Sequence, residues 1–154
     1  KAHPDLFVRV NKLHNARLPT GERWAGFGNL FLIERPELFA VQVSRRAGQE
    51  ELRELKARVA ERTAEGAVMV SPFISPGEKE VAMMVMEQAY GSLILIRPEG
   101  FPPLYKPSGR YFDLCAQGRL MVLTAFPYTG RKQTLTRDCC QKMNAWVRKI
   151  CTGP

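Results

Sequence analysis

The sequence lacks the patterns of a metal site and of a disulfide framework. It contains only two histidines and four cysteines, and no cysteine pair has the C-x-x-C spacing typical of zinc ligands. The adjacent Cys139 and Cys140 lie in a helical pattern, where they cannot readily bond to each other or face one metal ion. We therefore expect no metal, and reduced thiols in a reducing compartment.

Long apolar runs are also missing. No segment approaches the roughly 20 apolar residues that cross a bilayer, and no basic start with an apolar centre indicates a signal peptide. These absences predict a cytoplasmic protein without a membrane partner. The chain begins at Lys1 rather than at a methionine, which indicates a segment of a longer protein.

The signatures of common nucleotide-dependent and hydrolytic enzymes are absent too. The sequence has no G-x-G-x-x-G after a strand pattern, no G-x-x-x-x-G-K-[ST] and no G-x-S-x-G. Ser71 and Ser75 have no histidine in the α/β core to act as a base. Glu78 and Glu80 would point about 200° apart on a helix, and favourable placement at a helix start explains both. We therefore expect no catalytic residue and no cofactor.

Positive charge is what the sequence has in excess. Lysine and arginine number 23 against 15 acidic residues, which gives a formal net charge of +8 and a pI near 9.6. Such an excess attracts polyanions within a Debye length of about 8 Å, and nucleic acid is the commonest intracellular polyanion. Charge alone does not distinguish this function from a solvated basic surface.

Hydrophobic periodicity predicts the fold. With 154 residues, of which 45% are hydrophobic, the chain has the size of one ordinary domain. The alternation of apolar strands with amphipathic helices predicts an α/β fold with a doubly wound, mainly parallel sheet and helices on both faces. The expected strands are 38–44, 67–71, 92–98 and 119–125, and the expected helices are 48–65, 76–90, 110–117 and 137–151.

The N-terminal part is less regular. Residues 1–28 contain the turn sequence Pro19-Thr20-Gly21, and we interpret them as an N-terminal lead-in that forms either a hairpin or an irregular segment. Residues 29–35 read as a short helix or turn that ends before Pro36. The domain itself is then expected over residues 29–154.

Basic residues follow three of the four expected strands. Because the carboxyl ends of parallel strands meet at one edge of the sheet, the loops that carry these residues should converge there. Aromatic residues are interleaved with the cations, and this combination is typical of single-stranded nucleic-acid sites, although each ring alone also suits core packing. The cations are Arg45, Arg46, Lys106, Arg110, Arg131 and Lys132, and the aromatics are Phe101, Tyr105, Tyr111 and Phe126.

Four sequence elements resemble those of the DprA/Smf family of DNA-processing proteins, Rossmann-like members of the SLOG superfamily. VQVSRRAG resembles the family's "GSR" element, and AVMVSPFISPGEKEVAMMVMEQ resembles "vvSGgA-GID-aAH-gAL". LILIRPEGFPPLYKP resembles "tiaVLg-Gld-vYP", and CQKMNAWVRKI resembles "RNRiia-ls". The resemblance spans roughly residues 28–151 in order, and it implies a Rossmann-like sheet.

The resemblance also implies a function. In the family these elements line a positive pocket that binds the backbone and bases of single-stranded DNA, which the protein protects and hands to a recombinase. Ser44 and Arg45 match "SR", Ser71 matches the serine of "SGgA", and Lys106 falls in the "YP" loop. Asn144 matches the asparagine of "RN".

The sequence departs from the family at its glycines. Val43 stands at the glycine of "GSR", Pro72-Phe73 replace a glycine pair, Gly77-Glu78 replace "GID", and Met143 replaces the arginine of "RN". Bulkier residues keep the backbone from approaching a ligand closely. The departures indicate a divergent relative that binds DNA differently, or one that keeps only the fold.

These observations lead to a first hypothesis of a nucleic-acid-binding module that prefers single-stranded DNA. The six cations would contact phosphate, and Tyr105 and Asn144 would face the bases. Other expected partners are a second copy in a homodimer, a recombinase and a fused upstream domain. The expected contact residues are Ser44, Arg45, Arg46, Ser71, Tyr105, Lys106, Arg110, Arg131, Lys132 and Asn144.

Two alternatives stay open from the sequence. One is a SLOG-type domain that senses or hydrolyses a nucleotide derivative in the crevice between Ser44 and Ser71. Related phosphoribohydrolases carry "PGG-GT—E", of which Pro76-Gly77-Glu78 keeps only a part. The other is a scaffold within a larger protein of DNA recombination or mobile-element transactions.

Overall fold

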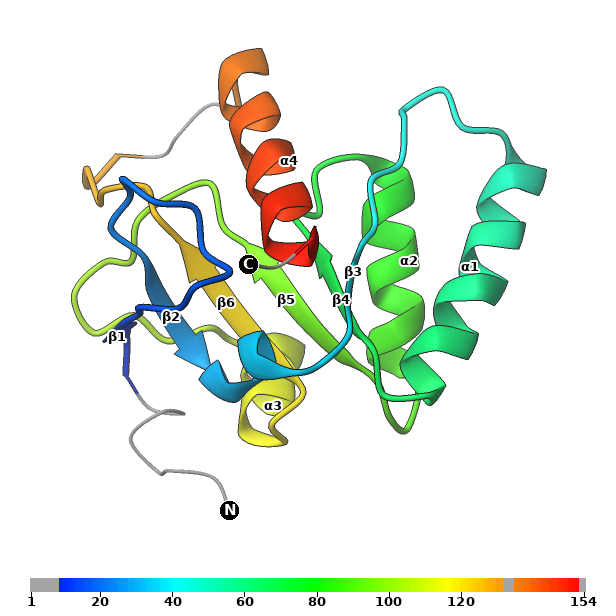
Figure 1. The fold of residues 1–154 in the computed structure, drawn as a ribbon, viewed down its shortest axis with the longest axis horizontal. Helices are drawn as coiled ribbons and strands as arrows, with labels where there is room; N and C mark the ends of the chain where they lie inside the picture. Colours follow the sequence, from blue (N-terminus) through cyan, green and yellow to red (C-terminus); the bar gives the residue numbers. More distant parts are fainter. Residues whose placement is uncertain (1–8, 132–134, 153–154) are drawn as a thin grey trace.

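A computed structural model describes residues 9–131 and 135–152 of the chain. Within these residues, six strands form one sheet, and four α-helices and a 3-10 helix pack against it (Figure 1). The elements are β1 (Asn11–Lys12), β2 (Ala25–Gly28), η2 (Leu30–Glu34), β3 (Leu38–Ala40), α1 (Gln49–Ala64), β4 (Val68–Ser71), α2 (Pro76–Glu87), β5 (Ser92–Ile96), α3 (Arg110–Ala116), β6 (Leu120–Thr124) and α4 (Arg137–Thr152).

The sheet is mainly parallel, which confirms the predicted fold class. The strand order is β1-β2-β6-β5-β4-β3, and the four strands from β3 to β6 are parallel to their neighbours. β2 pairs antiparallel with both β1 and β6. The N-terminal hairpin therefore extends the same sheet beyond β6.

Helices cover both faces of the sheet. Residues of α1, α2 and α3, such as Val59, Val81 and Leu114, form one core with alternate strand residues. Residues of η2 and α4, such as Leu32 and Trp146, form the second core on the opposite face. Because successive strand residues point to opposite faces, strands buried on both sides read as continuous apolar runs.

The first parallel strand is shorter than the apolar run that encodes it. The sequence predicts a strand over 38–44, but β3 ends at Ala40. Val41 N–H still donates to Val70 C=O at 3.0 Å, whereas Val43 N–H donates to the carboxylate of Glu78 at 2.9 Å. At Val43 a hydrogen bond to a side chain thus takes the place of the backbone hydrogen bond to the neighbouring strand. Residues 41–43 are therefore held in place although they are not part of β3.

The predicted start of α2 at Pro76 is confirmed, and a capping box stabilises it. Ser75 is the N-cap, and its Oγ accepts a hydrogen bond from Glu78 N–H at 3.1 Å. The Glu78 carboxylate accepts in return from Ser75 N–H at 3.4 Å, which completes a capping box. Pro76 at the first helical position suits the fixed φ of proline.

Neither a membrane span nor a metal cluster is present in the described part of the chain. None of its helices is both long and apolar enough to cross a bilayer. No group of three or more histidine, cysteine or acidic side chains among residues 9–131 and 135–152 could hold a metal ion.

Two of the four cysteines have strongly shifted thiols. Burial raises the pKa of Cys115 from 9.0 to about 12. Burial also raises the pKa of Cys151 to about 12, although the positive charges of Arg17 and Arg62 oppose the shift. The structure has all four cysteines as free thiols.

We expect Cys115 and Cys151 to resist thiol reagents at pH 8 in the native protein and to react on unfolding, because the thiolate is the reactive form. Their folded-state pKa values lie above the ordinary value, so their contribution to stability is complete below about pH 9 and is lost as the pH rises toward 12. Mass-spectrometric mapping of labelled peptides checks the first point, and urea melts from pH 8 to 11 check the second. Rapid native labelling of Cys115 would contradict the prediction.

Candidate nucleic-acid interface

The loops that follow the four parallel strands emerge at one edge of the sheet. Figure 1 shows the loops after β3 and β6 at the same end of the molecule as the start of α4. β3 and β6 lie three strand positions apart, or about 14 Å at the usual strand spacing. Groups on these loops therefore form a broad rim rather than one narrow crevice.

Glu78 joins the loops that follow β3 and β4. One carboxylate oxygen accepts from Val43 N–H at 2.9 Å, and the other accepts from Ile74 N–H at 2.9 Å. The side chain is buried, and it occupies backbone N–H groups of the kind that hold phosphate in other sheets. The Glu78 carboxylate therefore already accepts hydrogen bonds from the N–H groups that a bound phosphate would otherwise use.

The crevice expected between Ser44 and Ser71 is filled by the protein. Ser71 is completely buried, and its Oγ accepts from Phe73 N–H at 3.2 Å. Val43 packs directly on α2, since a Cβ at Gly77 would lie 2.5 Å from Val43 Cγ1. Ser44 is exposed, and its Oγ accepts from Arg46 N–H at 3.1 Å. The structure thus keeps the two serines in different environments.

The prediction that Glu78 and Glu80 serve as helix-start acids describes their roles only in part. Glu78 does stand at the helix start, but it also ties two loops together across 35 residues of sequence. Glu80 forms an ion pair with Lys56 of α1. The two carboxylates have separate structural partners, so they do not converge.

Five of the six predicted cations are exposed, and we call these five side chains the cation rim. Arg45 and Arg46 follow β3, whereas the others belong to the loops after β5 and β6 or to the start of α3. Lys132, the sixth, lies outside the described residues. The cation rim consists of Arg45, Arg46, Lys106, Arg110 and Arg131.

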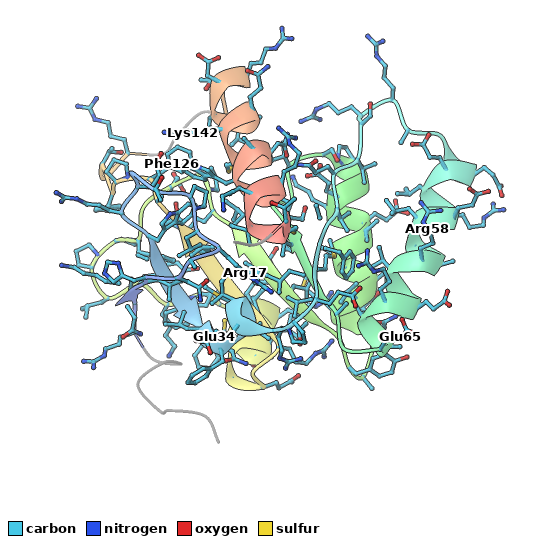
Figure 2. All side chains as sticks on the ribbon, in the orientation of Figure 1. Arg17, Glu34, Arg58, Glu65, Phe126 and Lys142 are labelled. Carbon is cyan, nitrogen blue, oxygen red and sulfur yellow. The ribbon has the colours of Figure 1, made fainter. Side chains whose placement is uncertain are left out.

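Lys142 of α4 is a further basic residue near the start of that helix. Figure 2 places Lys142 beside Phe126 at the end where α4 starts, and Glu34 and Glu65 toward the opposite end. Lys142 Nζ lies 5.7 Å from the centre of the Phe126 ring and 3.8 Å from a Glu22 carboxylate oxygen. Lys142 thus adds a partly paired cation near the rim.

Tyr105 packs inward rather than outward. Its ring stands edge-on to Phe27 at 5.3 Å and packs against Phe101 at 4.7 Å, and the Arg97 guanidinium lies 4.8 Å from its centre. Burial raises the pKa of Tyr105, and the charge of Arg97 opposes this shift. The ring of Tyr105 therefore packs the loop after β5 against β2.

Asn144 lies in α4 beside the segment that follows β3. Its backbone carbonyl accepts from Gln42 Nε2 at 2.9 Å. Its side-chain oxygen is shielded from solvent and has no hydrogen-bond partner among the described residues. Asn144 therefore retains acceptor capacity, but not on the exposed surface.

Two hollows open beside the cation rim. The first, which we call the loop hollow, has a volume of about 530 Å³ and lies between the 101–106 segment, Val10 and Tyr128. The second, the edge hollow, measures about 230 Å³ and is lined by residues that include Phe73, Lys79 and Tyr111. Both combine apolar walls with a basic group.

Sequence reasoning missed Lys79 and Tyr128. Lys79 stands in the first turn of α2, where the helix dipole disfavours a cation, and this mismatch is a signal that could have indicated it. Tyr128 belongs to the loop after β6 and is half exposed. No pattern in the sequence places Tyr128 opposite the loop that follows β5.

Comparison with known proteins identifies the fold. No family model and no curated protein matches the sequence. The structure is similar to that of DNA processing protein A from Helicobacter pylori, whose single-stranded DNA binding mode is described structurally, with a TM-score of 0.65 and 13% identity. It is also similar to DNA processing protein A (DprA) from Streptococcus pneumoniae, with a TM-score of 0.64 and 18% identity.

The two similarities extend over nearly all of this chain. They cover 93% and 94% of it, but only 66% and 52% of the respective neighbours. At these identities the likeness defines the fold. The chain therefore has a DprA-like fold, that is, a Rossmann-like, mainly parallel sheet with helices on both faces.

Proposed function

We propose that the chain binds single-stranded nucleic acid, with DNA preferred, along the cation rim. The observation that carries the proposal is that five exposed cations, on separate segments, follow the carboxyl ends of β3, β5 and β6. Positive side chains on such a rim hold phosphates without reading sequence. The likeness to a protein whose single-stranded DNA binding is described supports the choice of nucleic acid.

Exposed rings favour a single strand over a duplex. Tyr111 lines the edge hollow and Tyr128 lines the loop hollow, and both tyrosines are exposed. Aromatic rings stack on bases only where the bases are unpaired and their faces are accessible. A rim that alternates cations with such rings suits an unpaired strand.

The proposal is for binding rather than hydrolysis of nucleotides. A glycosidic hydrolase needs a carboxylate that can act on charge at the sugar. Both oxygens of Glu78 already accept backbone hydrogen bonds, and its side chain is buried. We therefore expect no release of base from nucleoside monophosphates.

The wider setting that we propose is DNA processing, in recombination or in mobile-element transactions in the cytoplasm. A recombinase, a second copy of the chain or an adjoining domain would then be the protein partners. The chain spans 66% and 52% of the length of its two structural neighbours. Copurification with a recombinase tests this setting.

A salt series tests the proposal directly. We expect log affinity for a single-stranded DNA oligomer to fall linearly with log salt, with a slope of about −0.7 for each phosphate contact. Five contacts from the cation rim would give a slope near −3.5. Fluorescence anisotropy with single-stranded DNA, duplex DNA and RNA of equal length measures both slope and preference. A flat slope, or no binding in low salt, would overturn the proposal.

A further inference from the structure

We propose that the loop hollow is a base-binding subsite, in which an unpaired base stacks on Tyr128 while the adjoining phosphate contacts Lys106. The inference rests on the proposed function. It locates the recognition of a base, rather than of the phosphate backbone, in the loop hollow. It assigns the stacking ring to Tyr128, which is the more exposed of the two tyrosines that line the hollow.

The lining of the loop hollow matches one nucleotide in kind. Its walls are mainly apolar or aromatic, and they include Phe101 and Tyr105. Two of its nine lining residues, Arg9 and Lys106, are basic, and none is acidic. Its volume of about 530 Å³ falls in the range of small-ligand sites, which is roughly 300–1,000 Å³. Charge and shape together favour an anionic partner with a flat ring.

Leu104 marks the rim of the hollow as a binding surface. Its side chain is fully exposed, and its backbone has a φ of 58°. The left-handed conformation is unfavourable for leucine, and strain of about 1–3 kcal/mol persists where the surroundings impose it and clusters at ligand sites. A strained residue that shows an apolar side chain to solvent contributes little to folding. It does provide an apolar edge on which a base can lie.

The walls of the hollow are held in place without a ligand. Arg97 Nε donates to Glu99 C=O at 3.1 Å, and the guanidinium lies over the rings of Tyr105 and Phe101. The loops after β5 and β6 touch through their backbones, since a Cβ at Gly100 would lie 2.2 Å from Tyr128 N. This contact sets Tyr128 opposite the 101–106 segment. Association would therefore need little rearrangement there.

The test pairs Tyr128 with a tyrosine of equal exposure. Tyr128 and Tyr90 are both 52% exposed, and Tyr90 lies in the turn between α2 and β5, at the other end of the strands. The probes are a thymidine oligomer and an abasic oligomer of the same length, which keeps the phosphates but has no bases. Affinities come from fluorescence anisotropy at fixed salt, and thermal melts establish that each variant is folded.

We expect Tyr128→Ala to weaken binding of the thymidine oligomer about 5- to 150-fold, as for the loss of one stacked base. Binding of the abasic oligomer should change less than twofold. Tyr128→Phe should retain the affinity of the wild type for both probes, since the ring remains. Tyr90→Ala should bind both probes like the wild type.

Other outcomes separate this inference from the proposed function. If the wild type binds both oligomers with a steep salt slope while Tyr128→Ala matches Tyr90→Ala, the subsite is overturned and the binding function stands. Equal losses by Tyr128→Ala on both probes would also overturn the subsite, because the ring would then act without a base. If the wild type binds neither oligomer in low salt, the proposed function itself fails.

Discussion

Glu78→Ala is expected to lower the free energy of unfolding by about 2–5 kcal/mol, because it leaves buried backbone N–H groups of two loops without an acceptor. Val43 and Ile74 each donate to the carboxylate at 2.9 Å, and Ser75 donates more weakly at 3.4 Å. Each unsatisfied buried group costs about 1–3 kcal/mol. Glu78→Gln should lower the free energy of unfolding by an intermediate amount. The glutamine oxygen can still accept from one backbone N–H, but its NH2 group would face the other N–H and cannot accept from it.

Glu80→Ala is the matched control for this prediction. Glu80 lies two residues further along the same helix and pairs with Lys56 at the surface. An exposed ion pair of this kind contributes about 0–1 kcal/mol. Urea unfolding followed by circular dichroism measures both variants. Equal losses for the two variants would show that Glu78 acts only as a helix-start acid, and measurable base release that Glu78→Gln abolishes would restore the hydrolase alternative.

The joint replacement of Arg45, Arg46 and Arg131 by alanine is expected to weaken binding of single-stranded DNA about 100-fold at 0.1 M salt. Each lost phosphate contact makes the salt slope shallower by about 0.7, so three contacts reduce it by about 2.1. If the variant and the wild type have equal affinity at 1 M salt, this slope difference makes their affinities differ by about 100-fold at 0.1 M salt. Anisotropy titrations at four or more salt concentrations measure the slope and the affinity together.

A second triple variant removes the same charge from elsewhere on the surface. Arg35, Arg53 and Arg58 are exposed and lie outside the cation rim, before β3 and on α1. Arg58 stands on the outer part of α1 in Figure 2. Their joint replacement should leave the salt slope close to that of the wild type. If both triple variants lose affinity equally, net charge rather than the cation rim governs binding.

The order of the elements was predictable because its signals are local. The apolar runs at 67–71, 92–98 and 119–125 contain β4, β5 and β6, and the Ser75-Pro76 start of α2 is readable as a cap. The β-strand over Ala25–Gly28 was harder to predict, because a four-residue segment with two glycines has little strand propensity. Gly28 is needed there, since its φ is 96° and a Cβ would lie 2.4 Å from Leu120 O.

The candidate site was predictable only in part. The sequence alone shows that the cations follow β3, β5 and β6, because the apolar runs locate these strands. It could not reveal that Glu78 would fill the crevice, since that contact joins residues 35 positions apart. It also could not place Tyr105 inward, because the ring packs on Phe27 of a strand 78 positions earlier in the chain. Long-range packing decided both cases.

The order of the strands has a consequence for solubility. β6 is an entirely buried strand of five residues, and β2 occupies the side of it that does not face β5. The strands at the two edges of the sheet, β1 and β3, have only two and three residues. Short edges offer little template for pairing with another chain, whereas a long apolar edge promotes aggregation. A fragment that starts at residue 29 would leave β6 open on that side, so the hairpin keeps an aggregation-prone strand covered.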